Sequence, residues 1–270
     1  MPSFSAQLSP PAFFRYALWR MAGRRFELPL RLRNGTRFFL RPPNAENGDY
    51  GVAYEIFALS YYAPPGGVEL GEPRLIVDLG GNVGLSVLHW LNTYPGCTVE
   101  TFEPNPRHVA QMRRNLALGR QAHRVSIHQK AAAVAPGVLR LSNLGTSSSL
   151  ANAGPDGFDV EAVDVLAHLR GRSIDLLKMD IEGGEYDILA DPRFAELDLR
   201  CLVMEWHARH DGEADRRWCE RRLADMGFVI HPLFAEAEHG MFWAVRAAPP
   251  TSRQDGTARQ DRHVNHGEMA

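Results

Sequence analysis

Cysteine is scarce in this chain of 270 residues, which has only Cys97, Cys201 and Cys219. Their number is odd, and no two of them stand in the C-x-x-C spacing of zinc and redox sites. Because disulfide frameworks and structural zinc sites need several paired cysteines, we expect neither here. The cysteine content therefore favours a reducing compartment and predicts a cytoplasmic location.

Long apolar runs are also missing from the sequence. No stretch reaches the roughly 18 apolar residues of a membrane-spanning helix, and the start of the chain lacks the basic-then-apolar pattern of a secretory signal. Neither sign of charge is in large excess, because the formal net charge is −2 and the pI is about 6.6. This balance does not favour nucleic acid or an anionic membrane as a partner, so we expect a small-molecule partner instead.

From Arg74 onward, the sequence contains a regular alternation of apolar strands and helices. Unbroken apolar runs are typical of strands that are buried on both faces. The alternation predicts right-handed crossovers and a doubly wound, mostly parallel α/β sheet. A short turn joins the last two strands, which should therefore pair antiparallel. The seven expected strands are Leu75–Leu79, Thr98–Phe102, Arg124–Gln129, Ile174–Met179, Cys201–Trp206, Phe228–Leu233 and Met241–Arg246.

The rest of the chain is arranged around this α/β domain, which we place at residues 74–248. Residues 1–73 are expected to form an N-terminal extension, and the Asn34-Gly35 pair within it predicts a hairpin. Residues 249–270 are polar and aperiodic, so we expect them to be disordered. Further expected elements are a helix over Asp49–Tyr62, a hairpin over Gly137–Ser142, a Gly/Ser-rich loop over Asn143–Ser149 and a helix over Val163–Leu169.

The first strand of the domain runs into a glycine-rich turn with the sequence DLGGNVG, from Asp78 to Gly84. Ligands of open α/β sheets bind at such turns, beyond the carboxyl ends of the strands. The dinucleotide motif G-x-G-x-x-G does not fit, because Asn82 or Val83 stands where its second glycine would be. An acid at this place would repel a phosphate and attract a sulfonium or an amino group. We therefore predict a ligand with an amino-acid moiety, bound by Asp78, Gly80, Asn82 and Gly84.

A second acid follows the next strand, which ends in Glu103-Pro104-Asn105. A carboxylate at this place can accept hydrogen bonds from both hydroxyls of a ribose. Together with the glycine turn, Glu103 indicates a nucleoside that carries an amino acid. We expect Asn105, Ala131 and Asp180 to belong to the same ligand site.

Three segments of the chain resemble the FkbM family of methyltransferases: DLGGNVG at 78–84, FEPNP at 102–106 and KMDIEGGEYDIL at 178–189. The resemblance spans about residues 37–245, and the K-x-D-x-E-G-x-E element in the third segment is its most specific part. One position departs from the family pattern, since Gly81 stands where alanine is usual, and we expect this to be harmless. The resemblance implies the Rossmann-like class I methyltransferase fold, S-adenosylmethionine as the methyl donor, and a hydroxyl acceptor on a sugar or secondary metabolite.

Candidate catalytic residues follow the fourth and fifth strands. Lys178 and Asp180 share a strand face, and a lysine inside an apolar strand is costly without a partner. The pair is either a structural ion pair or a device that orients the acceptor hydroxyl and takes its proton. His207 or Glu182 could act as the base instead. Asp180 and Glu205, together with His207, could hold Mg²⁺, although we favour a site without a tightly bound metal.

These features together predict an S-adenosylmethionine-dependent O-methyltransferase that acts on a small molecule, such as a sugar, a glycoside or a polyketide-type secondary metabolite. One alternative is a non-catalytic domain that only binds S-adenosylmethionine. The other is a methyltransferase that acts on nitrogen or nucleic acid. That second alternative lacks its usual D/N-P-P-Y/F signature, because Asp180-Ile181-Glu182-Gly183 follows the fourth strand.

Overall fold

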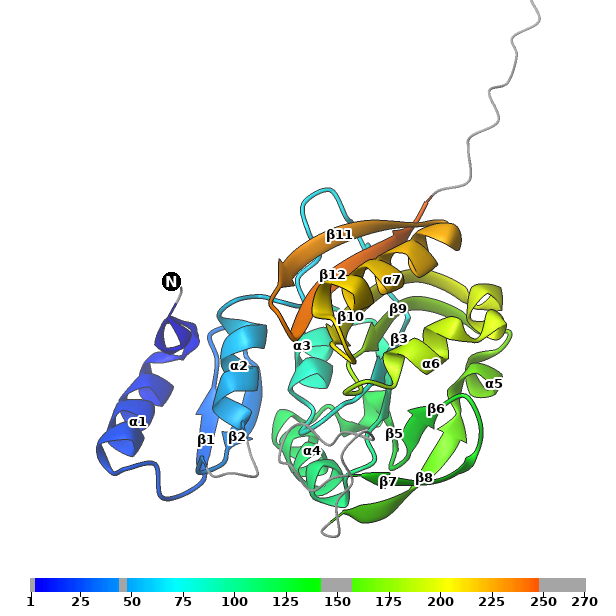
Figure 1. Ribbon diagram of the computed structural model, residues 1–270. Helices are drawn as coiled ribbons and strands as arrows, with labels where there is room; N and C mark the ends of the chain where they lie inside the picture. Colours follow the sequence, from blue (N-terminus) through cyan, green and yellow to red (C-terminus); the bar gives the residue numbers. More distant parts are fainter. Residues whose placement is uncertain (1–2, 44–47, 142–156, 248–270) are drawn as a thin grey trace, which may run out of the picture.

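The computed structural model describes residues 3–43, 48–141 and 157–247. At its centre is a seven-stranded sheet in the order β11-β12-β10-β9-β3-β4-β5 (Figure 1). β12 is antiparallel to both of its neighbours and the other pairs are parallel, so the predicted sheet is confirmed. Its strands are β3 (Leu75–Leu79), β4 (Thr98–Phe102), β5 (Val125–His128), β9 (Ser173–Met179), β10 (Asp198–His207), β11 (Phe228–Ala235) and β12 (His239–Arg246).

Helices cover both faces of this sheet, and each face has its own apolar core (Figure 1). Successive strand residues point to opposite faces, so Leu176 belongs to the core under α3 and α4, whereas Leu177 belongs to the core under α5, α6 and α7. This double burial explains why the strands read as unbroken apolar runs. The helices are α3 (Leu85–Thr93), α4 (Pro106–Gly119), α5 (Val165–Leu169), α6 (Glu185–Ala190) and α7 (Gly212–Asp225), with short 3-10 turns at Ala122–Arg124 and Pro192–Glu196.

The N-terminal extension packs onto the same core as α3 and α4. The predicted hairpin at Asn34-Gly35 is present, and Phe38 and Leu40 from it share an apolar cluster with Leu88 of α3. The predicted helix begins at Asp49 but ends at Phe57, five residues earlier than expected. The elements of this region are a 3-10 turn at Phe4–Gln7, α1 (Pro10–Met21), β1 (Leu28–Arg31), β2 (Arg37–Leu40) and α2 (Asp49–Phe57).

A second, three-stranded sheet in the order β6-β8-β7 was not expected from the sequence. The hairpin predicted within Gly137–Ser142 is wrong, because this segment supplies the single strand β7, which pairs with the later strand β8. The helix predicted from Val163 begins only at Val165, since β8 continues to Asp164. The sequence signal that could have predicted β8 is its alternation of apolar and polar residues, which matches the alternate burial of Val160 and Ala162. The strands are β6 (Ala131–Ala133), β7 (Gly137–Leu141) and β8 (Phe158–Asp164).

Two predicted segments, the loop over Asn143–Ser149 and the tail at 249–270, lie outside the described residues. Among the helices that the structure does describe, none is long and apolar enough to cross a membrane. The strand order reverses between β3 and β9, because the chain continues from β3 to β4 and β5 and then returns to β9. Ligands of doubly wound sheets bind beyond the carboxyl ends of the strands at such a reversal.

Candidate active site

The glycine turn connects β3 to α3 at this reversal of strand order. Gly80 and Gly84 have φ angles of +88° and +81°, which L side chains rarely adopt. The N–H groups of Gly80 and Gly81 both donate to the carbonyl of Phe102 on β4, at 2.9 and 3.1 Å. A Cβ on Gly80 would collide with the carbonyl oxygen of Asp180, which follows β9. Glycine therefore lets the ends of three neighbouring strands approach one another.

Gly81, where the family usually has alanine, has a packing reason of its own. A Cβ at this position would collide with Oγ1 of Thr101 and lie 2.8 Å from Cε of Met112. The departure from the family pattern therefore goes with Thr101 on β4 and Met112 on α4, which take up the space that a methyl group would need.

Lys178 on β9 lies against the turn and is almost completely buried. Its Nζ is 3.3 Å from Asp78 and 3.4 Å from Asp180, and it donates to the carbonyl of Gly80 at 2.6 Å. Burial alone would lower the pKa of Lys178, but the carboxylates of Asp78 and Asp180 outweigh it and raise the pKa well above its usual value. Lys178 is thus a cation at neutral pH. This arrangement suits a residue that holds Asp180 in place, and it does not suit a proton acceptor.

Glu103 follows β4 and is buried, with both carboxylate oxygens held by backbone groups. One oxygen accepts from the N–H of Asn82 at 2.7 Å, and the other accepts from the N–H of Asn105 at 2.9 Å. His108 of α4 lies 3.4 Å from the second oxygen. These contacts fix the orientation of the carboxylate, and each oxygen keeps a lone pair for a further donor.

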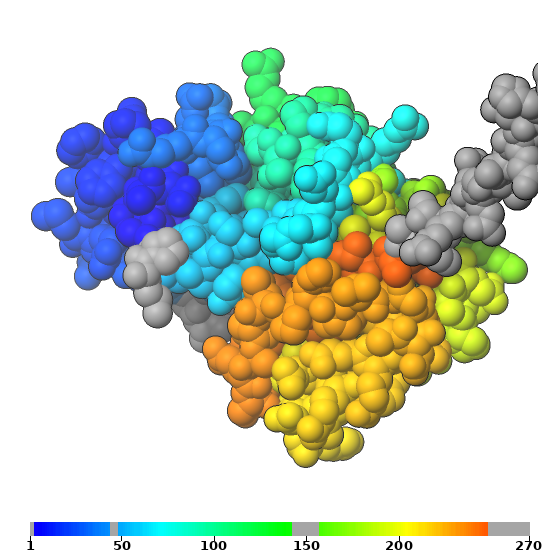
Figure 2. All heavy atoms as spheres, turned by 90° about the horizontal axis from the view of Figure 1, so that it is seen from above, coloured from blue at the N-terminus to red at the C-terminus, as the bar shows by residue number. Residues whose placement is uncertain are grey.

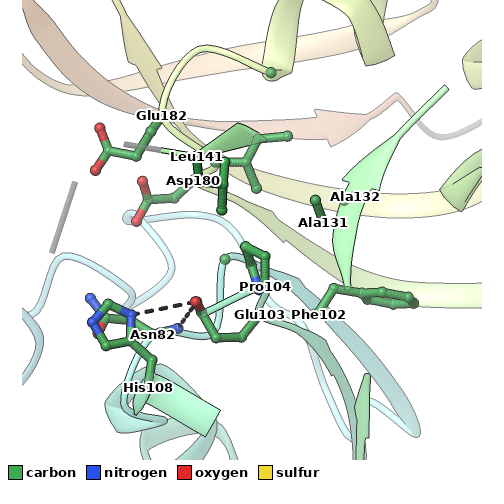
Figure 3. A pocket seen from close by; sticks show the side chains of 13 residues that line it. Asn82, Phe102, Glu103, Pro104, His108, Ala131, Ala132, Leu141, Asp180 and Glu182 are labelled. Atoms are coloured by element: carbon green, nitrogen blue, oxygen red, sulfur yellow. Dashed lines mark hydrogen bonds and ion pairs between the residues drawn. The ribbon is translucent and has the colours of Figure 1, made fainter. Parts of the chain in front are cut away.

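The Glu103 side chain lines a cavity of about 640 Å³ at the carboxyl ends of β3, β4 and β9. Figure 3 shows Glu103 on one side of this cavity and Asp180 and Glu182 on the other. We call it the β4 cavity. Its described lining holds three carboxylates and no lysine or arginine, and Phe102, Leu141 and two alanines provide an apolar wall. Such a surface suits a ligand with an apolar ring and positive charge, and it does not suit a phosphate.

Five of the eight residues predicted to bind the cofactor line the β4 cavity: Gly80, Asn82, Glu103, Ala131 and Asp180. The other three lie behind its wall. Asp78 is fully buried between Lys178 and Ser86, Gly84 precedes the first turn of α3, and Asn105 caps α4 by accepting from the N–H of Arg107. Glu182, which the sequence predicted as a catalytic residue, also lines this cavity. The lining residues that sequence reasoning missed are Phe102, Pro104, His108, Ala132, Leu141, Ile181 and Gly184.

A second cavity, of about 470 Å³, adjoins the first and shares Gly80, Asn82 and Asp180 with it. We call it the α2 cavity, because Val52, Glu55 and Ile56 of α2 form one wall. Behind α2 the lining continues with two tyrosines, of which Tyr62 is buried and Tyr61 is half-buried. No sequence signal predicts this wall, since nothing in the first 73 residues indicates which of them face β9. Further lining residues are Lys178, Glu205 and Met241.

An imidazole surrounded by carboxylates lies at the end of β10, beside both cavities. His207 is 3.4 Å from Glu182, 3.4 Å from Glu185 and 3.9 Å from Glu205. Burial alone would lower the pKa of His207, but the carboxylates of Glu185, Asp180 and Glu182 outweigh it and raise the pKa to about 10. His207 is therefore an imidazolium at neutral pH, which argues against its use as a base.

The two carboxyl groups near His207, those of Glu205 and Glu185, are stabilised in different ways. Burial, together with the nearby carboxylate of Asp180, raises the pKa of Glu205 to about 9, so this side chain is protonated at neutral pH. Glu185 is fully buried and accepts from the N–H groups of Ile181 and Gly183, each at 2.8 Å. It thereby fixes the turn that follows β9, a role that the sequence motif alone did not indicate.

Two groups of described residues have metal-ligand spacing. One combines Asp180 and His207 with Glu185, whereas the sequence suggests Glu205 as the further ligand. His207 would have to lose its proton before it could bind a metal, and each oxygen of Glu185 already accepts a backbone hydrogen bond. The other group is Glu100, His128 and His168, and Arg172 contacts its carboxylate at 2.5 Å with a charge that would repel a cation.

The Methyltransferase FkbM domain matches residues 78–237 of this chain. The 31-O-demethyl-FK506 methyltransferase FkbM of Streptomyces tacrolimicus is 30% identical over 224 residues, which cover 67% of this chain and 84% of that protein. Methyltransferase 1 of Beauveria bassiana is 30% identical over 145 residues. This match covers 44% of this chain and only 58% of that protein. The solved structure of methyltransferase FkbM from Methylobacillus flagellatus has a TM-score of 0.47 and 14% identity, and covers 87% of this chain and 60% of that one. The domain match and the Streptomyces relative show that this chain belongs to the FkbM family of methyltransferases.

Proposed function

We propose that this chain transfers a methyl group from S-adenosylmethionine to a hydroxyl of a small molecule. The observation that carries this proposal is the junction of the β4 cavity and the α2 cavity at Gly80, Asn82 and Asp180. A transfer between two bound molecules needs two compartments that open onto each other. The residues at the junction would lie where donor and acceptor meet.

The β4 cavity has the chemistry that S-adenosylmethionine requires. Glu103 is pre-oriented and would accept from the two ribose hydroxyls. Phe102, Ala131 and Leu141 offer an apolar surface for the adenine ring. The carboxylates of Asp180 and Glu182 face the same space and would attract the positive sulfonium and amino groups (Figure 3). When bound, this cofactor supplies an already activated methyl group.

The protein has two tasks in this transfer, which are to hold the acceptor hydroxyl in line and to receive its proton. Asp180 is the only carboxylate among the described residues that lines both cavities. We assign it the hydrogen bond from the acceptor hydroxyl, with Glu182 as the neighbouring proton acceptor. Lys178 lies 3.4 Å from the Asp180 carboxylate and would hold it in position. His207 balances the surrounding carboxylates, and we assign it no proton transfer.

A small hydroxylated acceptor fits the α2 cavity better than a macromolecule does. The cavity holds about 470 Å³, and Tyr61, Tyr62 and Met241 could pack against a sugar ring or a polyketide. The Streptomyces relative is named for a demethylated FK506, which is a small molecule. The identity of the acceptor within the sugars, glycosides and polyketides is left to a substrate screen. We also propose that no tightly bound metal takes part.

The first test is thermal unfolding with and without ligands. S-adenosylhomocysteine should raise the melting temperature of the wild type, because a ligand that binds only the folded state stabilises it, and NAD should not. Glu103→Ala should weaken S-adenosylhomocysteine binding by about 1.5–3 kcal/mol, the usual scale for hydrogen bonds to a charged group, measured by calorimetry. Glu161→Ala, at an exposed acid on β8, serves as the matched control.

The outcomes separate binding from catalysis. Stabilisation by NAD in place of S-adenosylhomocysteine would contradict the cofactor assignment. Tight S-adenosylhomocysteine binding without methyl transfer to any hydroxylated acceptor would support the non-catalytic alternative. Prior treatment with EDTA should leave most of the methyl transfer activity, and complete loss that Mg²⁺ restores would contradict the metal-free proposal.

A further inference from the structure

The N-terminal part of the chain has the opposite charge to the rest. Residues 1–43 contain eight arginines and a single acid, Glu27, so their formal charge is 8 − 1 = +7. Because the whole chain carries −2, residues 44–270 carry −2 − 7 = −9. Glu27 is itself paired with Arg114 of α4, at 2.7 Å. A charge asymmetry of this size indicates that the N-terminal part meets an anionic surface.

Helix α1, which belongs to this basic part, is apolar on two opposite sides. Its inner side buries Ala12, Tyr16 and Trp19 in the core. Its outer side is also apolar, although it faces solvent. Of the eight large apolar side chains exposed among the described residues, five lie between positions 13 and 26: Phe13 (43%), Phe14 (68%), Leu18 (63%), Met21 (83%) and Phe26 (51%). Exposed apolar patches of this kind mark interaction surfaces.

Exposed arginines border the apolar side of α1. On a helical wheel its exposed apolar residues span an arc of about 140°, with Arg15 beyond one edge and Arg20 beyond the other. Arg25 follows the helix and is also exposed. Long arginine side chains can reach upward from an apolar surface to charged groups around it. A helix with an apolar face and arginines along its borders is typical of segments that lie in the interface of a membrane.

The position of α1 leaves this side accessible. Figure 1 shows α1 at one end of the molecule, on the far side of the β1–β2 hairpin from the main sheet, and Figure 2 shows the N-terminal segment projecting at the same end. We define the α1 surface as Phe13, Phe14, Leu18, Met21 and Phe26 with Arg15, Arg20 and Arg25.

We propose that the α1 surface binds an anionic lipid bilayer, with the helix lying in the plane of the headgroups. A second copy of the chain fits less well, because it would bring a second set of arginines against the first. Nucleic acid would meet the arginines but would leave the phenylalanine, leucine and methionine side chains without an apolar partner. A bilayer interface offers both anionic groups and an apolar layer.

Co-sedimentation of the full chain with vesicles tests this proposal without any use of methyl transfer. The wild type should sediment with phosphatidylcholine vesicles that contain phosphatidylglycerol, and much less with phosphatidylcholine alone. Phe14→Glu with Leu18→Glu should lower the partition coefficient about tenfold or more, because both charges would enter the apolar layer. Each arginine near an anionic surface raises the partition coefficient about fivefold. The triple variant Arg15→Gln, Arg20→Gln and Arg25→Gln should therefore have a partition coefficient more than about tenfold lower than that of the wild type.

Matched controls separate the α1 surface from general effects of charge. Val138→Glu alters an exposed apolar residue on β7, and the triple change Arg170→Gln, Arg217→Gln and Arg221→Gln removes three exposed arginines elsewhere. Both controls should sediment like the wild type. All variants should keep the wild-type melting temperature, since the altered side chains are exposed.

Three outcomes would overturn the proposal. The first is a wild type that fails to sediment with anionic vesicles, and the second is a Phe14→Glu, Leu18→Glu variant that sediments unchanged. The third is a different occupant of the α1 surface. A dimer that this double variant converts to a monomer would assign the surface to a second copy. Binding to a short RNA duplex, lost only in the Arg15, Arg20 and Arg25 variant, would assign it to nucleic acid.

Discussion

At the scale of single residues, Lys178 links the glycine turn to the fourth strand through charge. Its ammonium is shared between Asp78, which has no exposed surface, and Asp180, which is partly exposed to both cavities. Removing one member of a buried ion pair leaves an uncompensated charge, which costs more than the pair contributes. We infer that Lys178 neutralises Asp78, and we propose that it also positions Asp180.

Lys178→Ala should lower the free energy of unfolding by about 3–5 kcal/mol, because Asp78 is left charged and buried. Lys178→Arg should not restore it, since a planar guanidinium is too large for a site that is 2% exposed. Denaturant unfolding of each variant measures both effects. The other lysine of the chain is a natural control, because Lys130 pairs with Glu161 at the surface. Lys130→Ala should change the free energy of unfolding by at most about 0.5 kcal/mol.

A compensating change distinguishes charge from packing at this position. Lys178→Met with Asp78→Asn removes both charges and keeps similar volumes, so it should recover much of the stability that Lys178→Ala loses. Turnover should remain low, because Asp180 has lost its partner. Equal stability of Lys178→Ala and Lys130→Ala would contradict the assignment of a buried ion pair.

At the scale of elements, the β3–α3 turn holds three strand ends together. Gly80 donates to Phe102 at the end of β4, accepts from Lys178 on β9 and leaves no room for a Cβ next to Asp180. The turn that follows β9 is fixed in a different way, by the two N–H groups that Glu185 accepts. The two turns face each other at the junction of the cavities, so a disturbance of either one should affect both donor and acceptor binding.

Gly80→Ala should abolish binding of S-adenosylhomocysteine and destabilise the fold, because the added methyl would collide with the backbone of Asp180. Gly171→Ala is the matched control, since Gly171 also has a positive φ, of +72°, but open space around it. The control should lose about 1–2 kcal/mol from backbone strain alone and should keep its ligand affinity. Calorimetry with S-adenosylhomocysteine compares the two, and similar affinities for both variants would contradict the steric argument.

At the scale of the whole molecule, the N-terminal extension and the α/β domain share one core. Phe38 and Leu40 of the hairpin pack in the same cluster as Leu88 and Trp90 of α3. The buried amide of Asn115 on α4 accepts from the N–H of Phe39, at 2.9 Å, and donates to the carbonyl of Val83, at 2.8 Å. We therefore propose that residues 1–73 are part of the folding unit and do not form a detachable cap.

Removal of residues 1–73 should abolish cooperative unfolding, because it exposes the apolar face of α3 and removes one wall of the α2 cavity. Differential scanning calorimetry of residues 74–248 measures this. A cooperative transition with undiminished affinity for S-adenosylhomocysteine would instead show that the α/β domain is autonomous.

The sequence by itself determined the seven-stranded sheet and the location of the candidate ligand site. Unbroken apolar runs report burial on both faces, and the acids and glycines that end β3, β4 and β9 must meet at one edge of a parallel sheet. These signals are local, so they do not depend on how distant segments pack. The family resemblance rests on the same segments, since they contain the glycines and carboxylates that line or support the candidate ligand site.

Only the tertiary structure decided which charged side chains form ion pairs and which segments line the same cavity. Asp78 was expected to face a ligand. Instead, Lys178, which lies 98 residues after Gly80 in the sequence, neutralises Asp78 from the neighbouring strand. The pairing of β7 with β8 and the α2 wall of the cavity likewise depend on contacts between distant segments. Net charge and periodicity average over the chain, whereas pKa values, cavities and surfaces arise from atoms that folding brings together.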